Sequence, residues 1–250
     1  MPTLFADIDN TLIYSHRHTI TSPKRVVEFL NGKEQSYMTE FTYSFLTGKH
    51  GLQIVPVTTR TLPQYLRLEN LIQELGCEYS RICNGAILLH HMQIDQDWYE
   101  ESLELASTEI SEILNAEKWL INNCGFTSTH STFGLFVYAK TSDSGNLAAA
   151  LQQHVDTDKV DILFDHNKTY CIPKSMNKGS AIKRFSQRFN VTASIAAGDS
   201  EFDIPMLNQA KIAIIPQELF AYIQNKKAIV CKLDSLFSDE VCRVITEISP

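Results

Sequence analysis

The sequence contains no apolar run close to the ~20 consecutive residues that a membrane-spanning helix requires. Its first residues carry no basic group ahead of the apolar stretch, and Asp7 follows too early for the apolar region of a signal peptide. Both absences lead us to expect a cytoplasmic protein that has no membrane partner.

The cysteines lack any metal-binding or redox pattern. No two of the six form a CxxC pair, and no histidine cluster completes a zinc set; the cysteines lie at positions 77, 83, 124, 171, 231 and 242. We therefore expect reduced and mostly buried thiols.

An excess of basic residues is also missing. The formal net charge is -7, so we expect no nucleic-acid partner. A phosphate-binding site in such a chain needs its own local cation or a metal ion. Repeats and low-complexity linkers are absent as well.

The chain does have enough apolar residues to form a substantial core. It has 250 residues, of which 44% are hydrophobic and 20% charged. This length fits one large domain, or a core domain with a second domain inserted into it.

Short, continuously apolar runs indicate strands that are covered on both faces, as in a parallel sheet. Such runs occur at residues 4–6, 54–57, 195–197, 212–215 and 228–231. Helices are predicted between them: from Ser22-Pro23 to about Leu30, across 68–75 with Gly76 as the C-terminal cap, and after Lys178. Alternating strands and helices predict an α/β fold, a doubly wound parallel-sheet Rossmann-like core.

The middle of the chain has a different pattern. One long helical pattern covers residues 103–121 and is followed by β-rich runs at 133–139, 161–164 and 169–172, with a short helix at 146–154 among them. This predicts an α+β cap domain inserted at 84–172, with the core domain formed by 1–83 and 173–250.

Two carboxylates follow the first apolar run directly. Residues 7–11 read Asp-Ile-Asp-Asn-Thr, so Asp7 and Asp9 would lie at the carboxyl end of a strand, where open α/β sheets bind ligands. Like charges so close together favour a bound cation. One carboxylate could take up a phosphoryl group while the other transfers protons. The alternative is that both merely cap a turn.

A second acidic cluster follows a later apolar run. Residues 198–203 read Gly-Asp-Ser-Glu-Phe-Asp, and Asp199 and Asp203 could supply oxygen ligands to magnesium. The alternative is a turn followed by a helix N-cap, since Pro205 suits the first turn of a helix.

Two further features are weaker by themselves. Thr58 and Arg60 follow another apolar run, where a hydroxyl and an N–H could hold a phosphate oxygen. Lys178 falls in the first turn of a predicted helix, where a cation opposes the helix dipole. A surface ion pair for Arg60 and a solvated position for Lys178 are the alternatives.

Together, the four features resemble the motifs of the haloacid dehalogenase-like phosphatases. The DxDxT motif matches residues 7–11, the strand-end threonine matches Thr58, the lysine motif matches Lys178, and the GDxxxD motif matches residues 198–203. The position of the insertion, between Thr58 and Lys178, resembles the large α/β-cap (type IIB) branch, which includes Cof-type and sucrose-phosphate phosphatases.

This resemblance implies roles for the motif residues. Asp7 would be the nucleophile and Asp9 the acid and base. The metal, Mg²⁺, would be held by the carboxylates of Asp7 and Asp199 and by the backbone carbonyl of Asp9. Thr58 and Lys178 would bind the phosphate. Asn10, Arg60 and Asp203 would contact the substrate or support the catalytic, phosphate-binding and metal-binding residues.

The implied function is a magnesium-dependent phosphohydrolase that cleaves a small phosphorylated metabolite, a sugar phosphate by resemblance, through an aspartyl phosphate. The alternatives are a phosphomutase or phosphotransferase of the same fold, and a non-catalytic sensor of a phospholigand. Halide displacement is disfavoured because it does not require a second acid at Asp9.

The sequence departs from the family pattern at two positions. Phe202 stands where the closest branch has Asn, and Thr59 stands where it has Gly. His130, Lys140 and Lys168 lie in the predicted cap domain. From this location we expect that some of them determine substrate specificity.

Overall fold

The computed structural model describes residues 2–48, 51–192, 194–231 and 235–248. The chain divides into two compact units, Met1–Asp95 with Lys178–Pro250, and Gln96–Asn177. The sequence predicts that the cap domain covers residues 84–172, and this stays a prediction. The second compact unit covers residues 96–177. Residues 84–94 lie in the first unit because they pair with a strand of that unit.

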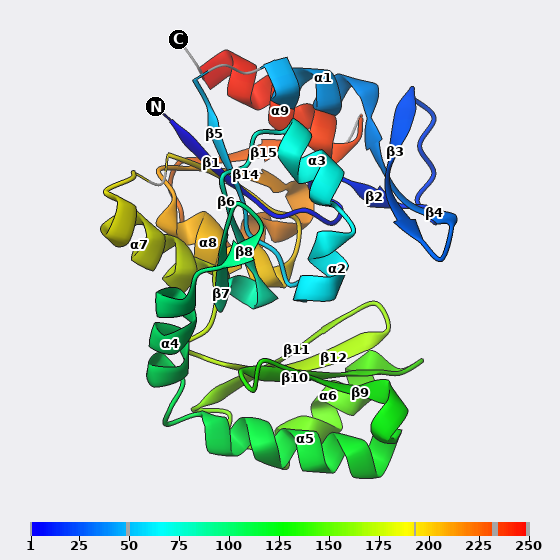
Figure 1. Ribbon diagram of the computed structural model, residues 1–250, viewed down its shortest axis with the longest axis vertical. Coiled ribbons are helices and arrows are strands. Elements are labelled where there is room, and N and C mark those ends of the chain that lie inside the picture. Colours follow the sequence, from blue (N-terminus) through cyan, green and yellow to red (C-terminus); the bar gives the residue numbers. More distant parts are fainter. Residues whose placement is uncertain (1, 49–50, 193, 232–234, 249–250) are drawn as a thin grey trace. The chain divides into compact units, whose positions relative to one another are not determined.

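The first unit is built on a five-stranded parallel sheet in the order β15-β14-β13-β1-β5 (Figure 1). The strands are β1 (Thr3–Ala6), β5 (Gln53–Pro56), β13 (Ile195–Ala197), β14 (Ile212–Pro216) and β15 (Ala228–Cys231). All five predicted apolar runs form this sheet, and β1, β13 and nearly all of β5 and β14 are buried. The predicted α/β class of the core is confirmed.

Helices connect and flank these strands. They are α1 (Glu40–Gly48), α2 (Leu62–Leu66), α3 (Glu69–Glu74), α7 (Lys178–Phe189), α8 (Ile204–Gln209) and α9 (Phe237–Ile248), with 3₁₀ turns at Cys83–Gly85, Glu201–Asp203 and Gln217–Tyr222. The predicted helix across 68–75 corresponds to α3, and Gly76 follows it with a φ of +66°. α7 begins at Lys178, as predicted, and it buries Ile182 and Phe185.

The helix predicted from Ser22 to Leu30 is wrong. The segment forms β3 (Lys24–Leu30), which pairs antiparallel with β4 (Lys33–Thr39); β2 (Tyr14–Ser15) completes a three-stranded sheet. Asn31 and Gly32 form the two-residue turn with φ values of 52° and 74°. An Asn-Gly pair between two β-rich runs is a strong hairpin signal, and it outweighs the Ser-Pro helix start.

A second small sheet follows α3. It contains β6 (Tyr79–Ile82), β7 (Ile87–His90) and β8 (Gln93–Ile94), paired antiparallel. A parallel bridge joins Val57, just after β5, to Arg81 in β6, which connects this sheet to the edge of the main sheet.

The second unit is an antiparallel sheet covered by helices, so the α+β insertion is confirmed. Its strands have the order β11-β12-β10-β9, with β9 (Thr129–Thr132), β10 (Phe136–Lys140), β11 (Val160–Asp165) and β12 (Lys168–Pro173). Its helices are α4 (Gln96–Leu105), α5 (Ile110–Cys124) and α6 (Ser144–Gln152), with a 3₁₀ turn at Phe126–Ser128. The single long helical pattern is therefore two helices, and β9 lies outside the predicted β-rich runs.

The core of this unit lies between one face of its sheet and two helices. Ile113, Ala116 and Leu120 of α5, with Ala148 and Leu151 of α6, pack against inward side chains of β10, β11 and β12. None of the helices in the described ranges combines the length and apolarity needed to span a bilayer.

Candidate active site

The predicted site residues lie at the carboxyl ends of three adjacent strands. Asp7 follows β1, Thr58 follows β5, and Asp199 follows β13. β1 lies between β5 and β13 in the sheet, and the chain reaches β5 on one side before crossing to β13 on the other. This reversal of strand order is the usual position of ligand sites in open α/β sheets.

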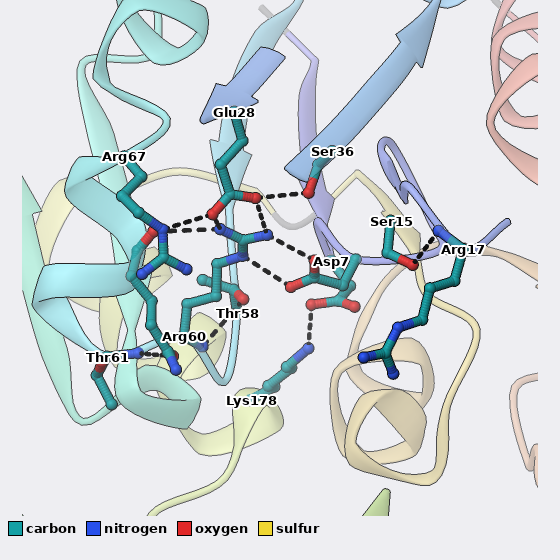
Figure 2. Close-up of polar contacts among 12 residues, drawn as sticks. Asp7, Ser15, Arg17, Glu28, Ser36, Thr58, Arg60, Thr61, Arg67 and Lys178 are labelled. Carbon is teal, nitrogen blue, oxygen red and sulfur yellow. Dashed lines mark hydrogen bonds and ion pairs between the residues drawn. The ribbon is translucent and has the colours of Figure 1, made fainter. Parts of the chain in front are cut away.

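Asp7 lies in a buried ion-pair network (Figure 2). The ammonium group of Lys178 is 2.6 Å from Oδ1 of Asp7, the contact drawn in Figure 2. It is also 2.6 Å from Oδ1 of Asp203. The side chains of Lys178 and Asp203 are 1% and 0% exposed. Lys178 is therefore not a solvated surface lysine, because its charge is shared by two buried carboxylates.

Burial and neighbouring charge both shift the acid–base behaviour of this network. Burial raises the pKa of Asp7 well above its ordinary value; Lys178 lowers it, and Asp203, Asp199 and Asp9 raise it further. Burial lowers the pKa of Lys178, but Asp203 and Asp7 more than reverse this, so the pKa lies above its ordinary value. Burial and the neighbouring carboxylates thus disfavour the ionised form of Asp7, and added positive charge would favour it.

Asp203 also fixes the loop that carries Asp199. Its Oδ2 accepts hydrogen bonds from the backbone N–H groups of Asp199 (3.1 Å) and Ser200 (3.0 Å), and from the Ser200 hydroxyl (2.9 Å). The close approach requires Gly198, since a Cβ there would lie 2.4 Å from Cβ of Asp203. Gly179 is needed in the same way, because its Cβ would lie 2.5 Å from the carbonyl oxygen of Pro205.

Three carboxylates of this region could share a cation. Ligand oxygens of Asp7, Asp199 and Asp203 lie within 4.8 Å of one another. The Thr11 hydroxyl donates to Oδ1 of Asp199 at 2.7 Å and so orients it. Because both oxygens of Asp203 are already hydrogen-bonded to Lys178 and to the loop, Asp7 and Asp199 are the better ligands of the three. An all-oxygen set with two carboxylates fits Mg²⁺.

Asp9 has different surroundings from Asp7. Its two oxygens accept hydrogen bonds from Nε and Nη2 of Arg60, both at 2.8 Å, in a bidentate pair. The Asp9 side chain is 47% exposed, whereas that of Arg60 is 9% exposed. The alternative of a surface ion pair for Arg60 is therefore wrong, because Arg60 is a largely buried arginine that orients the more exposed carboxylate.

Arg60 is itself held from the other side by Glu28. Nη1 and Nη2 of Arg60 donate to the two carboxylate oxygens of Glu28, each at 3.0 Å (Figure 2). Arg67 donates to Oε1 of Glu28 at 2.7 Å and Ser36 donates to Oε2 at 2.5 Å. Burial raises the pKa of Glu28, but Arg60, Ser36 and Arg67 outweigh this, so the pKa lies below its ordinary value.

Thr58 is fully buried, and its backbone is fixed by its neighbours. Its N–H donates to the carbonyl oxygen of Arg81 at 2.8 Å, and its carbonyl accepts from the N–H of Asn84 at 2.9 Å. The Thr58 hydroxyl accepts from the N–H of Arg60 at 3.1 Å. Thr58 therefore sets the position of Arg60 at the end of β5.

The two departures from the family pattern are accommodated without backbone strain. Thr59 is not among the residues of positive φ, so its position does not require glycine. Phe202 is 5% exposed and lies in the 3₁₀ turn that follows β13 and precedes α8. Asn10 adopts a φ of 58° in the tight loop after β1, a conformation that asparagine tolerates better than most residues.

Glu28, Ser36 and Arg67 are site residues that sequence reasoning missed. Glu28 lay in the segment interpreted as a helix, where it would have no defined partner. The Asn31-Gly32 turn signal could have identified the hairpin, and a shift of register beside Glu28 then places Glu28 opposite Ser36.

In the second unit, His130, Lys140 and Lys168 lie on the sheet face opposite α5 and α6. Lys140 pairs with Lys168 across β10 and β12, and His130 pairs with Tyr138 across β9 and β10. The rings of His130 and Tyr138 stack with centroids 4.8 Å apart, and the Lys168 ammonium is 5.6 Å from the Tyr138 ring centroid. Burial, then Lys140 and Lys168, lower the pKa of His130.

Comparisons with known proteins agree with this geometry. Residues 126–217 match the family model described as haloacid dehalogenase-like hydrolase. Among curated protein sequences, none matches the chain significantly.

Several solved structures share the fold over nearly the whole chain. A sucrose-phosphatase from Synechocystis sp. PCC6803, solved with sucrose and phosphate, is 16% identical with a TM-score of 0.62, covering 98% of this chain and 97% of its own. The subclass IIB sugar phosphatase BT4131 is 13% identical with a TM-score of 0.60, covering 99% and 98%. The phosphatase BT1666 from Bacteroides thetaiotaomicron is 13% identical with a TM-score of 0.58, covering 99% and 94%.

The family-model match in sequence and the similarity in fold along nearly the whole chain together confirm the resemblance to the haloacid dehalogenase-like hydrolases, and the similar structures include a subclass IIB sugar phosphatase.

Proposed function

We propose that this protein is a magnesium-dependent phosphohydrolase that cleaves a small phosphate monoester through an aspartyl phosphate on Asp7. The observation that carries the proposal is the buried Asp7–Lys178–Asp203 network beside Asp199, at the point where strand order reverses. Its negative charge exceeds its positive charge, which suits a cation and the phosphoryl group that the cation accompanies.

Asp7 would attack phosphorus in line with the leaving oxygen and take up the phosphoryl group on its carboxylate. Lys178, 2.6 Å from Asp7, would neutralise charge on the transferred oxygens, and the hydroxyl of Thr58 would donate a hydrogen bond to one of them. Electrostatic stabilisation of this kind supplies most catalysis of phosphoryl transfer.

Asp9 would transfer protons. It would protonate the leaving alcohol in the first step, then accept a proton from the water that hydrolyses the aspartyl phosphate. The bidentate contact with Arg60 would hold its carboxylate in place, while its 47% exposure leaves it accessible to solvent. Proton transfer by a positioned group is typically worth ~100- to 10,000-fold in rate.

Mg²⁺ would be held by the carboxylates of Asp7 and Asp199 and by the backbone carbonyl of Asp9. When bound, it would neutralise the phosphate and keep Asp7 ionised, which opposes the raised pKa of that group. Thr11 would keep Asp199 oriented toward this position.

The substrate is proposed to be a sugar phosphate, because the similar structures include a sucrose-phosphatase and a sugar phosphatase. His130, Lys140 and Lys168 remain the candidate specificity groups. The six cysteines are free, which is typical of a reducing compartment and supports a cytoplasmic location.

The test is release of inorganic phosphate from a panel of phosphorylated metabolites, with and without Mg²⁺, by the wild type and by Asp7→Asn. We expect release that depends on Mg²⁺ and is lost in Asp7→Asn. Exposed Asp165, in β11 of the other unit, offers a matched control as Asp165→Asn.

Failure of the proposal has two distinct forms. Redistribution of phosphate within the substrate, dependent on a bisphosphate activator and with little net release, would favour a phosphomutase. Saturable binding of a phosphorylated ligand to folded, magnesium-loaded protein without turnover would favour a sensor.

A further inference from the structure

A second cluster of metal-binding side chains lies outside the phosphoryl site. Glu78 precedes β6, and His90 and His91 lie at the end of β7 and in the turn after it. One ligand atom from each residue, a carboxylate oxygen and two ring nitrogens, lies within 4.8 Å of the others. All three residues are exposed, so an ion can reach them from solvent. We propose that they form a binding site for a divalent transition-metal ion of the Zn²⁺ type.

The backbone explains why two successive residues can share an ion. In a regular strand, successive side chains point to opposite faces. Here the two-residue turn between β7 and β8 consists of His91 and Met92, with φ values of 46° and 65°. The chain therefore turns at His91, and the ring centroids of His90 and His91 lie 4.5 Å apart.

A comparison of two turns in this molecule strengthens the inference. The β3–β4 turn adopts the same left-handed conformation with Asn31 and Gly32, the residues best suited to it. The β7–β8 turn uses His91 and Met92 instead; among residues other than glycine, histidine is enriched at positive φ, whereas methionine is not. Unfavourable backbone conformations of this kind persist mainly at functional sites. A ligand role for His91 accounts for its place in this turn.

The other two ligands are held in position before any ion arrives. The ring of His90 stacks on that of Tyr79, with centroids 4.7 Å apart and an interplanar angle of 9°. Nε2 of His90 lies 3.2 Å from Oε1 of Glu78. Tyr79 packs in turn against Phe185 and Phe189 of α7. Because these contacts limit rotation of the His90 ring, less side-chain entropy is lost on binding an ion.

The donor set separates this cluster from the phosphoryl site. Two imidazole nitrogens and a carboxylate oxygen suit Zn²⁺, whereas oxygen ligands alone suit Mg²⁺. Three protein ligands leave a coordination position for water or a small ligand, and a pocket of about 280 Å³, whose lining includes Cys77 and Met92, adjoins the cluster.

The two sites also lie at opposite ends of one strand. Arg81, near the far end of β6, accepts the hydrogen bond from Thr58, so the carboxyl end of β6 adjoins the phosphoryl site. At a rise of roughly 3.3 Å per residue, Glu78 lies about 10 Å along the chain from Arg81. An ion at Glu78 therefore does not belong to the phosphoryl site.

The test is isothermal titration calorimetry with Zn²⁺, in saturating Mg²⁺, on the wild type, His91→Ala and Glu78→Gln. Exposed His154, in the other unit, provides the matched control His154→Ala. We expect one Zn²⁺ per wild-type chain, binding at least about 10-fold weaker in His91→Ala and Glu78→Gln, and unchanged binding in His154→Ala.

Three results would overturn the inference. These are no Zn²⁺ binding by the wild type, equal affinity in the wild type and both cluster variants, or loss of binding in Asp199→Asn, which would assign the ion to the phosphoryl site. Metal-free melting temperatures equal to that of the wild type establish that the variants fold. Heat and stoichiometry are independent of phosphate release, so this test stands whether or not the proposed function is correct.

Discussion

The two halves of the candidate active site differ in charge balance. Around Asp7, the described ion pairs join two carboxylates, Asp7 and Asp203, to one ammonium group, that of Lys178, and Asp199 lies close by. Around Asp9, two carboxylates (Asp9 and Glu28) face two guanidinium groups, Arg60 and Arg67. Among the described ion pairs, the first half therefore has more negative than positive charge, and a cation from outside the chain would balance it.

This difference matches the chemistry proposed for each half. A negative, buried pocket can accept Mg²⁺ and the phosphate that follows it, but its carboxylates repel each other until the ion binds. The balanced network around Asp9 is ordered without an ion. This suits Asp9, because a carboxylate that transfers a proton must be held in a fixed position. Substitutions that change the charge balance around Asp7 or around Asp9, but not both, test this comparison.

The largest effect is expected from Lys178→Met. It leaves Asp7 and Asp203 buried without their shared cation, so we expect a loss of about 3–5 kcal/mol in the free energy of unfolding, together with loss of phosphatase activity. Urea unfolding measures the first. The control is Lys183→Met, because Lys183 is an exposed lysine of the same helix. Equal stability of the two variants would contradict the buried network.

In the balanced half, Arg60→Met should impair proton transfer by Asp9. We expect kcat/KM for an alkyl phosphate to fall by ~100- to 10,000-fold. The loss should be smaller for p-nitrophenyl phosphate, whose leaving group needs no proton. kcat/KM reports the steps up to formation of the aspartyl phosphate, so it isolates the acid role.

Arg67→Met is the matched control, because Arg67 contacts Glu28 but makes no described contact with Asp9. Equal losses for both substrates in Arg60→Met would show that Arg60 acts elsewhere than on the leaving group.

Magnesium should stabilise the wild type. At a concentration 100 times its dissociation constant, an ion bound only by the folded state adds about 2.7 kcal/mol to the free energy of unfolding. Asp199→Asn should abolish most of this gain, while Arg67→Met should keep it. Thermal unfolding with and without Mg²⁺ measures both, and an equal gain in Asp199→Asn would exclude Asp199 as a ligand.

The pH dependence of the free energy of unfolding, measured without metal, should reveal the raised pKa of Asp7. Because the folded-state pKa of Asp7 is raised, its contribution to stability is present below its ordinary pKa of 3.8 and is lost as pH rises through the folded value. The wild type should therefore lose stability relative to Asp7→Asn over this range, by about 1.4 kcal/mol for each unit of pKa shift. Urea unfolding across a pH series with a chelator measures the difference, and Mg²⁺ should diminish it.

The smallest effect is expected from Thr59→Gly, which restores the family residue. Thr59 does not have positive φ, so glycine relieves no strain and adds freedom to the unfolded chain. We expect a loss of about 0.4–1 kcal/mol in the free energy of unfolding and unchanged kcat/KM. A gain in stability would mean that the Thr59 side chain is strained.

Much of this protein was determined by local sequence. The five apolar runs of the main sheet, the helix that starts at Lys178 and the α+β insertion all follow from apolar periodicity, because a strand covered on both faces needs apolar residues throughout. Asp7, Thr58 and Asp199 could be identified as neighbours because carboxyl ends of parallel strands share one edge of a sheet.

Tertiary structure alone decided the partners of the charged groups. A buried charge must find its counterion wherever the fold brings one, and Glu28 lies 32 residues from Arg60 while Lys178 lies 171 residues from Asp7. No local pattern encodes such distances. The sequence therefore predicted which residues would carry the chemistry, and the fold decided which charged groups pair with one another.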